Sequence, residues 1–175
     1  STAQLDKLTM MVEKLLETAT LDGDDLALNK EEINLNEILE NLVQKHQTLA
    51  PEKSIRFTAL RENNWILGDA FHLDNALNNL LDNAVKYGGD TIEVTLNSRN
   101  GSYRILVSDS GTSLSKAEAK QIFEKFYRVP KGNTHDVKGF GIGLYYTQKI
   151  IEKHGGSIDV SVTSQTTFKI DLPNA

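Results

Sequence analysis

The chain has 175 residues, and its 19 lysines and arginines against 24 aspartates and glutamates give a formal net charge of −5. At roughly 150 residues per domain, this length corresponds to one domain and a short extra segment. The acidic balance argues against sequence-independent nucleic-acid binding, which depends on lysine and arginine contacts to phosphate. The chain has no cysteine, which excludes a disulfide framework and a thiolate nucleophile. Because no apolar run approaches the roughly 20 residues that span a bilayer, we expect a soluble chain that is compatible with the cytosol.

The first 25 residues carry a heptad pattern that the rest of the chain lacks. Their apolar positions step by three and four residues: Leu5, Leu8, Val12, Leu15 and Ala19. Such a stripe is typical of a helix with a helical partner, and Gly23 in an acidic run ends it. The helix could pack on its own domain, but we favour one helix of a bundle or dimer. We therefore divide the chain into residues 1–25 and 26–175.

Beyond this segment the chain alternates between strand and helix periodicities. Alternating apolar residues predict strands near 33–35, 55–59, 65–67, 92–96, 103–107, 158–162 and 168–172. Helices are predicted through 38–49, 73–84, 115–123 and 141–154, with Asn36, Asp69 and Ser115 as N-caps. A turn over 97–101 makes a hairpin, and residues 127–141 have no hydrophobic period and predict a long loop. The elements predict an α+β fold of two layers, with helices on one face of a mixed, mostly antiparallel sheet, preceded by one bundle helix.

The first group that could carry chemistry lies on the helix that follows Asp69. Asn79 and Asn83 are four residues apart and share a helix face, and Lys86 lies three residues beyond Asn83. Carboxamide oxygens are hard ligands suited to Mg²⁺, and lysine supplies a positive charge for phosphate. For an arbitrary pair of asparagines, a solvated polar face is the commoner explanation.

Two further groups contain glycine. Asp109 ends a predicted strand and precedes Gly111, so its carboxylate can enter a pocket and accept hydrogen bonds from an amino group. Glycines alternate at Gly139, Gly141 and Gly143 before a predicted helix, whose N–H groups and dipole favour phosphate. The spacing fits neither the dinucleotide fingerprint nor the P-loop. Each group alone has a structural alternative, a turn or a hinge, but their order along the chain favours one combined site.

In this order the motifs resemble those of the catalytic ATP-binding domain of bacterial sensor histidine kinases, within the Bergerat-fold superfamily that includes gyrase, Hsp90 and MutL. The resemblance covers about residues 33–172. Residues 79–87 match the N box, 109–111 the first glycine box, 122–128 the F box, 139–144 the second glycine box and 166–168 the final strand motif. The heptad segment resembles the second helix of the dimerisation domain as it enters the ATP-binding domain.

The resemblance implies that ATP and Mg²⁺ bind, and it assigns a role to each matching residue. Asn83, with Asn79, resembles the ligands of Mg²⁺ and phosphate, and Asp109 would accept the adenine amino proton. The other implied nucleotide-binding residues are Lys86, Arg128 and Lys138 for phosphate, Tyr87 beside adenine or ribose, Gly111 beside the base, Gly139, Gly141, Gly143 and Leu144 in a lid, and Thr167 near adenine. The family's first glycine box usually ends in a second glycine, where this chain has Ser113; the resemblance therefore implies a stiffer lid hinge.

One position bears on the reaction. ATP-hydrolysing relatives carry a glutamate four residues before the Mg²⁺ asparagine, and this chain has Asn79 there. Because a carboxamide cannot take up a proton, the resemblance implies phosphoryl transfer to a side chain rather than hydrolysis. The acceptor histidine of the family lies in a His-Glu/Asp-x-x-x-Pro context, which none of the four histidines has: His46, His72, His135 and His154. We expect the acceptor outside this chain, and no catalytic residue within it.

The partners implied by the resemblance are the phosphoacceptor dimerisation helix of the same kinase, a response regulator and a possible homodimer through residues 1–22. No nucleic acid is expected, and the chain would be the cytoplasmic portion of a sensor, with or without a membrane anchor. Two alternatives stay open. One is a nucleotide-binding regulatory module that signals by lid closure without phosphotransfer, and the other is a structural interaction domain that binds no nucleotide.

Overall fold

The computed structural model describes residues 2–9, 12, 26–111, 114–124, 127 and 143–174. The described strands are β1 (Glu31–Asn34), β2 (Ser54–Ala59), β3 (Trp65–Gly68), β4 (Thr91–Arg99), β5 (Ser102–Asp109), β6 (Ser157–Val162) and β7 (Thr166–Pro173). The described helices with defined bounds are α2 (Leu35–Leu49), α3 (Ala70–Tyr87), α4 (Lys116–Ala119) and α5 (Gly143–Lys153).

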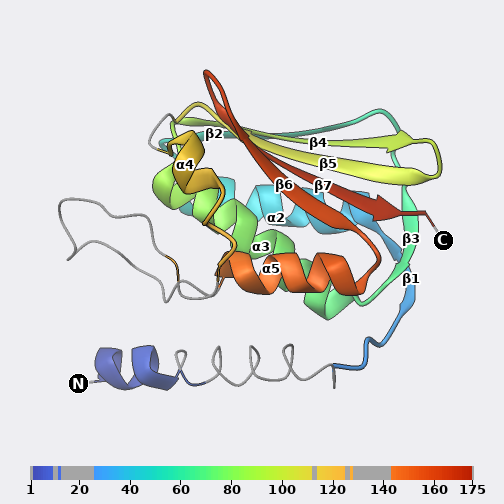
Figure 1. Ribbon diagram of the computed structural model, residues 1–175, viewed down its shortest axis with the longest axis horizontal. Helices are drawn as coiled ribbons and strands as arrows, with labels where there is room; N and C mark the ends of the chain where they lie inside the picture. The colour runs from blue at the N-terminus through green and yellow to red at the C-terminus, as the bar shows by residue number, and fades with distance from the viewer. Residues whose placement is uncertain are drawn as a thin grey trace.

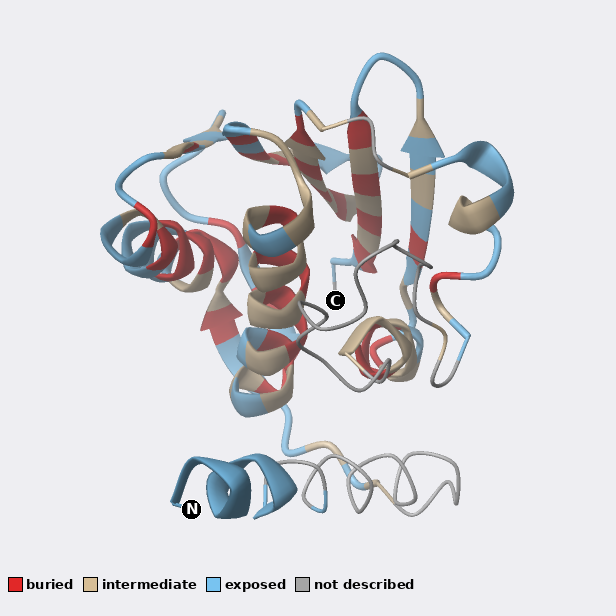
Figure 2. Ribbon diagram, turned by 90° about the vertical axis from the view of Figure 1, so that its left-hand side faces the viewer, coloured by how far each residue is buried: buried red, intermediate tan, exposed pale blue. Residues whose placement is uncertain are grey.

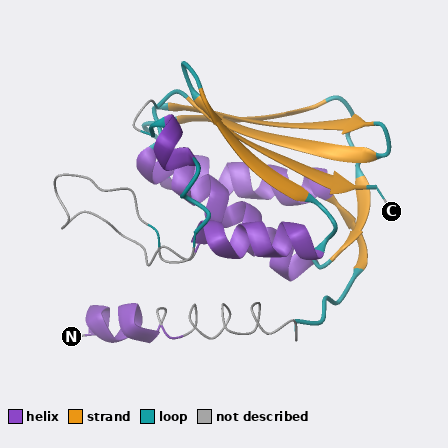
Figure 3. Cartoon of the chain, viewed as in Figure 1, coloured by secondary structure: helices purple, strands orange, loops and turns teal. Residues whose placement is uncertain are grey.

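Two layers make up the fold (Figures 1 and 3). Five strands form a sheet in the order β2-β4-β5-β7-β6, in which β2 and β4 are parallel and every other neighbouring pair is antiparallel. Helices α2, α3 and α5 cover one face of this sheet. The predicted α+β fold is confirmed. The pairing of β1 with β3 in a separate antiparallel ribbon is a feature that the sequence pattern did not predict.

The core lies between the sheet and the helices, as the buried stripes in Figure 2 show. Along β5 every second residue is buried, from Tyr103 to Asp109, because successive side chains of a strand point to opposite faces. On α3 the predicted stripe is buried throughout: Leu73, Leu77, Leu80, Leu81 and Ala84. Each fully buried leucine contributes roughly 1.5–3 kcal/mol by leaving water. Apolar burial therefore fixes which face of α3 and which face of β5 point inward.

Three boundaries differ from those expected from sequence. Helix α2 is capped by Asn34, whose side chain accepts a hydrogen bond from the backbone N–H of Asn36. Asn36 cannot serve as the cap because its side chain is buried and bonds Asn64 and the carbonyl of Arg61. The hairpin turn is shorter than 97–101, because β4 runs to Arg99 and β5 starts at Ser102, which leaves residues 100 and 101 as the turn, with φ of 46° and 81°. Helix α4 ends at Ala119 rather than 123, although its capping box is present.

The segment before residue 26 is described only in part. Residues 2–9 and 12 are helical, and the three described stripe residues are exposed, at 64% for Leu5, 57% for Leu8 and 47% for Val12. Leu15, Ala19 and Gly23 lie outside the described residues, so the division at residue 25 stays a prediction. Among the described helices, none has the length and apolar character that crossing a bilayer demands.

Asp69 joins three parts of the chain. Its carboxylate caps α3 by accepting from the N–H of His72, and its second oxygen accepts from the N–H of Asn29, 2.9 Å away. Its own N–H donates to Nε2 of His154, which follows α5, and Nδ1 of that ring lies 2.8 Å from the carbonyl of Ile150. His154 is therefore held as a neutral ring, because one nitrogen accepts while the other donates.

Burial lowers the pKa of His154 below its ordinary value of 6.5, because a charged imidazole would lose its hydration there. We therefore expect the free energy of unfolding to fall as the pH drops from 6.5 through the lowered pKa, since the unfolded chain takes up the proton first. Urea denaturation of the wild type and His154→Gln between about pH 5 and 8 measures this. The wild type should lose more stability on acidification than the variant; equal losses would contradict the assignment.

Candidate functional site

The predicted site residues come from three places that the fold brings together at one end of the sheet. The end of β5 pairs with the start of β4, as Asp109 is opposite Ile92. The end of α3 lies against Asp109, since a Cβ atom built on Gly88 would stand 2.6 Å from its Cγ. The start of α5 faces α3, since a Cβ on Gly143 would lie 3.8 Å from Cγ of Asn79. The described members of the three predicted groups, among them only Gly143 from the third, therefore line one region.

Asp109 occupies the last inward position of β5 and is 5% exposed. Its Oδ1 accepts hydrogen bonds from the N–H of Gly111 at 2.8 Å and of Gly89 at 3.4 Å. Burial raises the pKa of this carboxyl above its ordinary value, while the two N–H donors and the charge of Lys53 act in the opposite direction. No hydrogen bond from the described residues reaches Oδ2. Asp109 can thus present one unused acceptor to a ligand.

Glycines allow the backbone to close around this carboxylate. A Cβ on Gly88 would also clash with the carbonyl of Ala84, and a Cβ on Gly111 would lie 2.7 Å from the nitrogen of Gly89 and 2.9 Å from Oδ1 of Asp109. Sequence reasoning found Gly111 but missed Gly88 and Gly89. The sequence signal for Gly88 and Gly89 is a Gly-Gly pair directly after a predicted helix. Such a pair is typical of a helix end, but it does not indicate a contact with Asp109.

Asn79 and Asn83 lie one turn apart on α3, and both are half-buried. Nδ2 of Asn79 is buried and has no hydrogen-bond partner among the described residues. A buried polar atom without a partner costs roughly 1–3 kcal/mol, so this amide is suited to a polar ligand that the described part of the chain does not supply. Lys86 is exposed and its Nζ lies 2.8 Å from Oδ2 of Asp82. That surface ion pair is weak and can exchange for an anionic ligand.

The side chains near Asn79 and Asn83 suit Mg²⁺, which shares its coordination with water and phosphate, better than a metal that needs only protein ligands. The described residues contain no group of three His, Cys, Asp or Glu side chains able to hold a metal ion. Asn79 and Asn83 offer amide oxygens, and rotation of the buried Asn79 amide brings its oxygen to the unpartnered position. Mg²⁺ keeps several waters and shares phosphate oxygens, so two amides with a bound phosphate meet its preferences.

The structure brings Thr166, rather than the predicted Thr167, beside Asp109. The register of β5 and β7 places Thr166 opposite Asp109, and its buried hydroxyl donates to the carbonyl of Gly111 at 3.3 Å. Thr167 points to the other face of the sheet, where its Oγ1 is 2.9 Å from Oγ of Ser108. The prediction for Thr167 is corrected because neighbouring strand residues face opposite ways. Counting back by two from the buried Phe168 would have found Thr166.

The remaining predicted residues divide into two groups. Tyr87 is half-buried at the end of α3, and Gly143 and Leu144 begin α5, where Leu144 packs on the core. The hydroxyl of Thr147 lies 3.0 Å from the carbonyl of Ala76 and ties this first turn of α5 to α3. Other predicted residues lie outside the described part of the chain: Ser113, Arg128, Lys138, Gly139 and Gly141.

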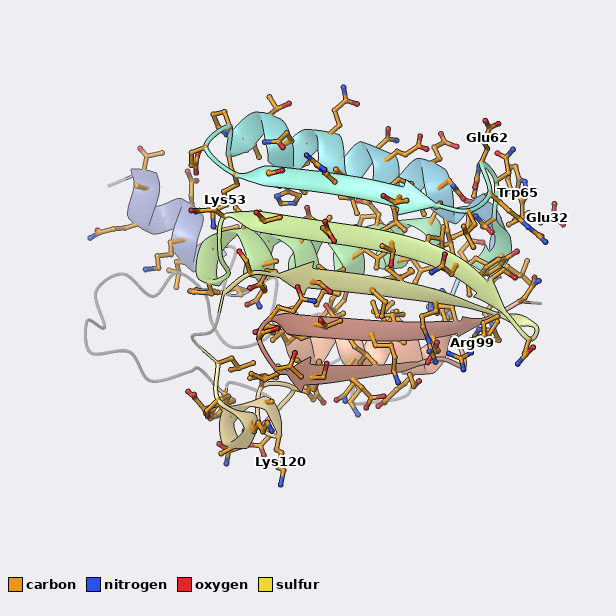
Figure 4. All side chains as sticks on the ribbon, turned by 90° about the horizontal axis from the view of Figure 1, so that it is seen from above. Glu32, Lys53, Glu62, Trp65, Arg99 and Lys120 are labelled. Carbon is orange, nitrogen blue, oxygen red and sulfur yellow. The ribbon has the colours of Figure 1, made fainter. Side chains whose placement is uncertain are left out.

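Lys53 is a further residue that sequence reasoning missed. It precedes β2, and its Nζ donates to the carbonyls of Val85 at 2.6 Å, Gly89 at 3.1 Å and Gly88 at 3.4 Å. Figure 4 shows it at the end of the molecule where α3 finishes. No local motif marks this lysine, because its partners are more than 30 residues further along the chain.

Comparisons with known proteins match most of the chain. A model of the family "Histidine kinase-, DNA gyrase B-, and HSP90-like ATPase" matches residues 68–175, which is more than half of it. Sensor protein RprX of Bacteroides fragilis is 36% identical over 175 residues, covering 95% of this chain and 34% of RprX. Sensor protein SrrB of Staphylococcus aureus is 33% identical over 173 residues, covering 95% of this chain and 30% of SrrB. The chain thus spans about a third of the length of these relatives.

Among solved structures, the catalytic domain of histidine kinase ThkA has a TM-score of 0.73 at 25% identity, covering 84% of this chain and 97% of that domain. ThkA in complex with the response regulator protein TrrA has a TM-score of 0.78 at 23% identity, covering 99% of this chain and 49% of that one. Both share the arrangement of sheet and helices described above.

Proposed function

This chain belongs to the family of histidine kinase-, DNA gyrase B- and HSP90-like ATPases, and from that premise we propose that it is the ATP-binding catalytic domain of a sensor histidine kinase. It binds ATP with Mg²⁺ and transfers the γ-phosphate to a histidine on a dimerisation helix outside the chain. The observation that carries this proposal is Asp109: a buried carboxylate at a strand end, with Oδ1 held by two backbone N–H groups and Oδ2 available.

Adenine recognition follows from that arrangement. Oδ2 of Asp109 accepts a hydrogen bond from the exocyclic amino group of the base, which guanine lacks at the corresponding position. Gly88, Gly89 and Gly111 carry no Cβ, so their backbones pack directly against Asp109 and Ser110 and against one another, which holds the carboxylate that receives the base. Thr166, held by the carbonyl of Gly111, lies on the same face of the sheet and replaces Thr167 in the expected contact. Tyr87 flanks the adenine or the ribose.

The phosphates lie toward the start of α5. Asn79 and Asn83 would hold Mg²⁺, and Lys86 would leave its surface pair with Asp82 to contact phosphate. Bound Mg²⁺ would neutralise charge on the phosphates as the γ-phosphoryl group leaves. Gly139, Gly141, Gly143 and Leu144 are proposed as a lid, supported by the second glycine box and by the position of Gly143 beside Asn79. Arg128, in the F box, and Lys138, directly before the second glycine box, are proposed as phosphate ligands.

The reaction is transfer rather than hydrolysis. An imidazole nitrogen of the acceptor histidine attacks the γ-phosphorus, the bond to the β,γ-bridging oxygen breaks, and ADP leaves with that oxygen. Hydrolysis would need a general base for water, and Asn79 occupies its position but cannot accept a proton. The nearby carboxylate of Asp82 lies about 100° around the helix from Asn83, so it does not replace that base.

The partners follow from the same proposal. The exposed side chains of Leu5, Leu8 and Val12 support residues 1–25 as the second helix of a dimerisation domain, and residues 1–22 as a homodimer contact. A response regulator is a further proposed partner, because the structurally similar ThkA was solved in complex with the response regulator protein TrrA. We place the chain on the cytoplasmic side, where ATP is available.

Two measurements test the proposal. Calorimetry measures the binding of ATP with Mg²⁺. A transfer assay then measures whether phosphate from labelled ATP reaches the dimerisation domain of the same kinase, added in trans. Binding with transfer to histidine is the expected result. Binding without transfer would indicate a regulatory module instead, and no binding heat would indicate a structural domain. Stable labelling of a histidine in the chain alone would overturn the expectation that the acceptor lies elsewhere.

A further inference from the structure

The side chain of Lys53 reaches the end of α3 from a turn far away in sequence. Its Nζ donates to the carbonyls of Val85, Gly88 and Gly89, and an ammonium group has three protons to give. Those carbonyls belong to the last turn of a helix and to the turn after it, where the helix dipole is negative. A cation there is favourable, and three bonds to one segment restrict how that segment can move.

The segment that Lys53 restrains is the one that binds Asp109. The N–H of Gly89 donates to Oδ1 of Asp109, and Gly88 packs against the carboxyl carbon so closely that a Cβ would not fit. With Gly111, the turn fixes which carboxylate oxygen is occupied and which faces outward. A shift of the turn would therefore rotate or release the carboxylate.

The charge of Lys53 also acts on Asp109. It lowers the pKa of that carboxyl against the larger opposing effect of burial. Other described charged groups near this end are Lys86, which is paired with Asp82, and the exposed Asp90 after the glycine turn. On β7 the facing residue is the uncharged Thr166. Lys53 is the one cation among the described residues that favours ionised Asp109.

We propose that Lys53 is a positioning residue for adenine: it holds the Gly88–Gly89 turn so that Asp109 keeps Oδ1 occupied and Oδ2 directed at the amino group of the base. The inference rests on the proposed function. It predicts that Lys53 affects recognition of the base. The contribution of Mg²⁺ and the triphosphate to binding affinity should stay unchanged, because the hydrogen bonds of Lys53 go to the turn beside Asp109.

Lys53→Gln tests this by calorimetry with ATP and GTP over a range of pH, with Lys53→Arg beside it. We expect Lys53→Gln to bind ATP about fivefold to tenfold more weakly, to bind GTP unchanged, and to lose ATP affinity at a higher pH than the wild type does. Lys53→Arg keeps the charge and should restore the pH profile. Arg99→Gln removes one positive charge from the exposed far end of β4 and is the matched control.

The outcomes separate this inference from the proposed function. A wild type that binds no ATP contradicts the function itself. A wild type that binds ATP, with a Lys53→Gln variant of equal affinity and pH profile, overturns the role of Lys53 alone. A second measurement leaves Lys53 in place and therefore does not depend on the folding of the Lys53→Gln variant. In an NMR titration over pH, the ¹⁵N signal of the Lys53 ammonium should follow the protonation of Asp109. In Asp109→Asn the same signal should stay constant. No response in the wild type would also overturn the inference.

Discussion

Asp109→Asn is expected to weaken ATP binding by about 100-fold, although the two side chains have the same shape. Oδ1 of Asp109 already accepts from the N–H groups of Gly111 and Gly89. An asparagine must place its oxygen there, because its NH₂ group cannot accept those bonds. The NH₂ group then faces the amino group of adenine, and two donors oppose each other.

The same substitution should make the folded chain more stable at neutral pH. Burial raises the pKa of Asp109, so ionising it costs more in the folded than in the unfolded state, and a neutral amide avoids that cost. Calorimetry with ATP and urea denaturation of each variant measure both effects, with the exposed Asp159→Asn on β6 as control. Undiminished affinity in Asp109→Asn would contradict the assignment of Asp109 to adenine.

In the wild type, ATP affinity should fall on acidification as Asp109 is protonated, because a protonated carboxyl loses its charge and its strength as an acceptor. Since the pKa of Asp109 is raised, this loss begins at a higher pH than for an ordinary aspartate. This pH dependence of the ATP affinity should vanish in Asp109→Asn. A profile shared by both chains would assign the titration to another group.

Asn79→Ala is expected to slow phosphotransfer by about 100-fold or more, the usual loss when a preorganised group at the reacting centre is removed. Stability should not fall, because the removed Nδ2 is buried with no partner among the described residues, and alanine is a better helix former. The rate of transfer to the dimerisation domain and the urea midpoint are the measurements.

Asn75→Ala provides the matched control for Asn79, because it is the same substitution one turn earlier on the same face of α3. It should change neither the rate nor the stability. If Asn79→Ala instead lost stability and kept its transfer rate, Asn79 would be a structural residue and the phosphate end of the site would have to be placed elsewhere.

Sequence reasoning found those parts of the site that lie in local patterns. Asn79 and Asn83 share a face because helix periodicity is fixed, and Asp109 follows a clear alternation of buried residues in β5. The resemblance assigns Thr167 to adenine, and it carries no information on the two-residue periodicity that decides which threonine faces Asp109.

The residues that sequence reasoning missed depend on contacts between distant segments. Lys53 contacts the end of α3 only after β2 has paired with β4. Gly88 contacts Asp109 only after β5 lies beside the end of α3. Similarly, Asn36 is an acceptable N-cap by composition, and only the approach of Asn64 moves the cap to Asn34. No window of neighbouring residues contains this information.

The parallel pair β2–β4 sets where the chain can be shortened. The family match begins at residue 68, yet β2, at 54–59, occupies the edge of the sheet next to β4. Truncation at residue 68 would remove α2 with its buried leucines and leave the nine residues of β4 as an open edge, a ready template for aggregation. It would also remove Lys53. The smallest independently folding unit therefore begins well upstream of the motifs that mark the site.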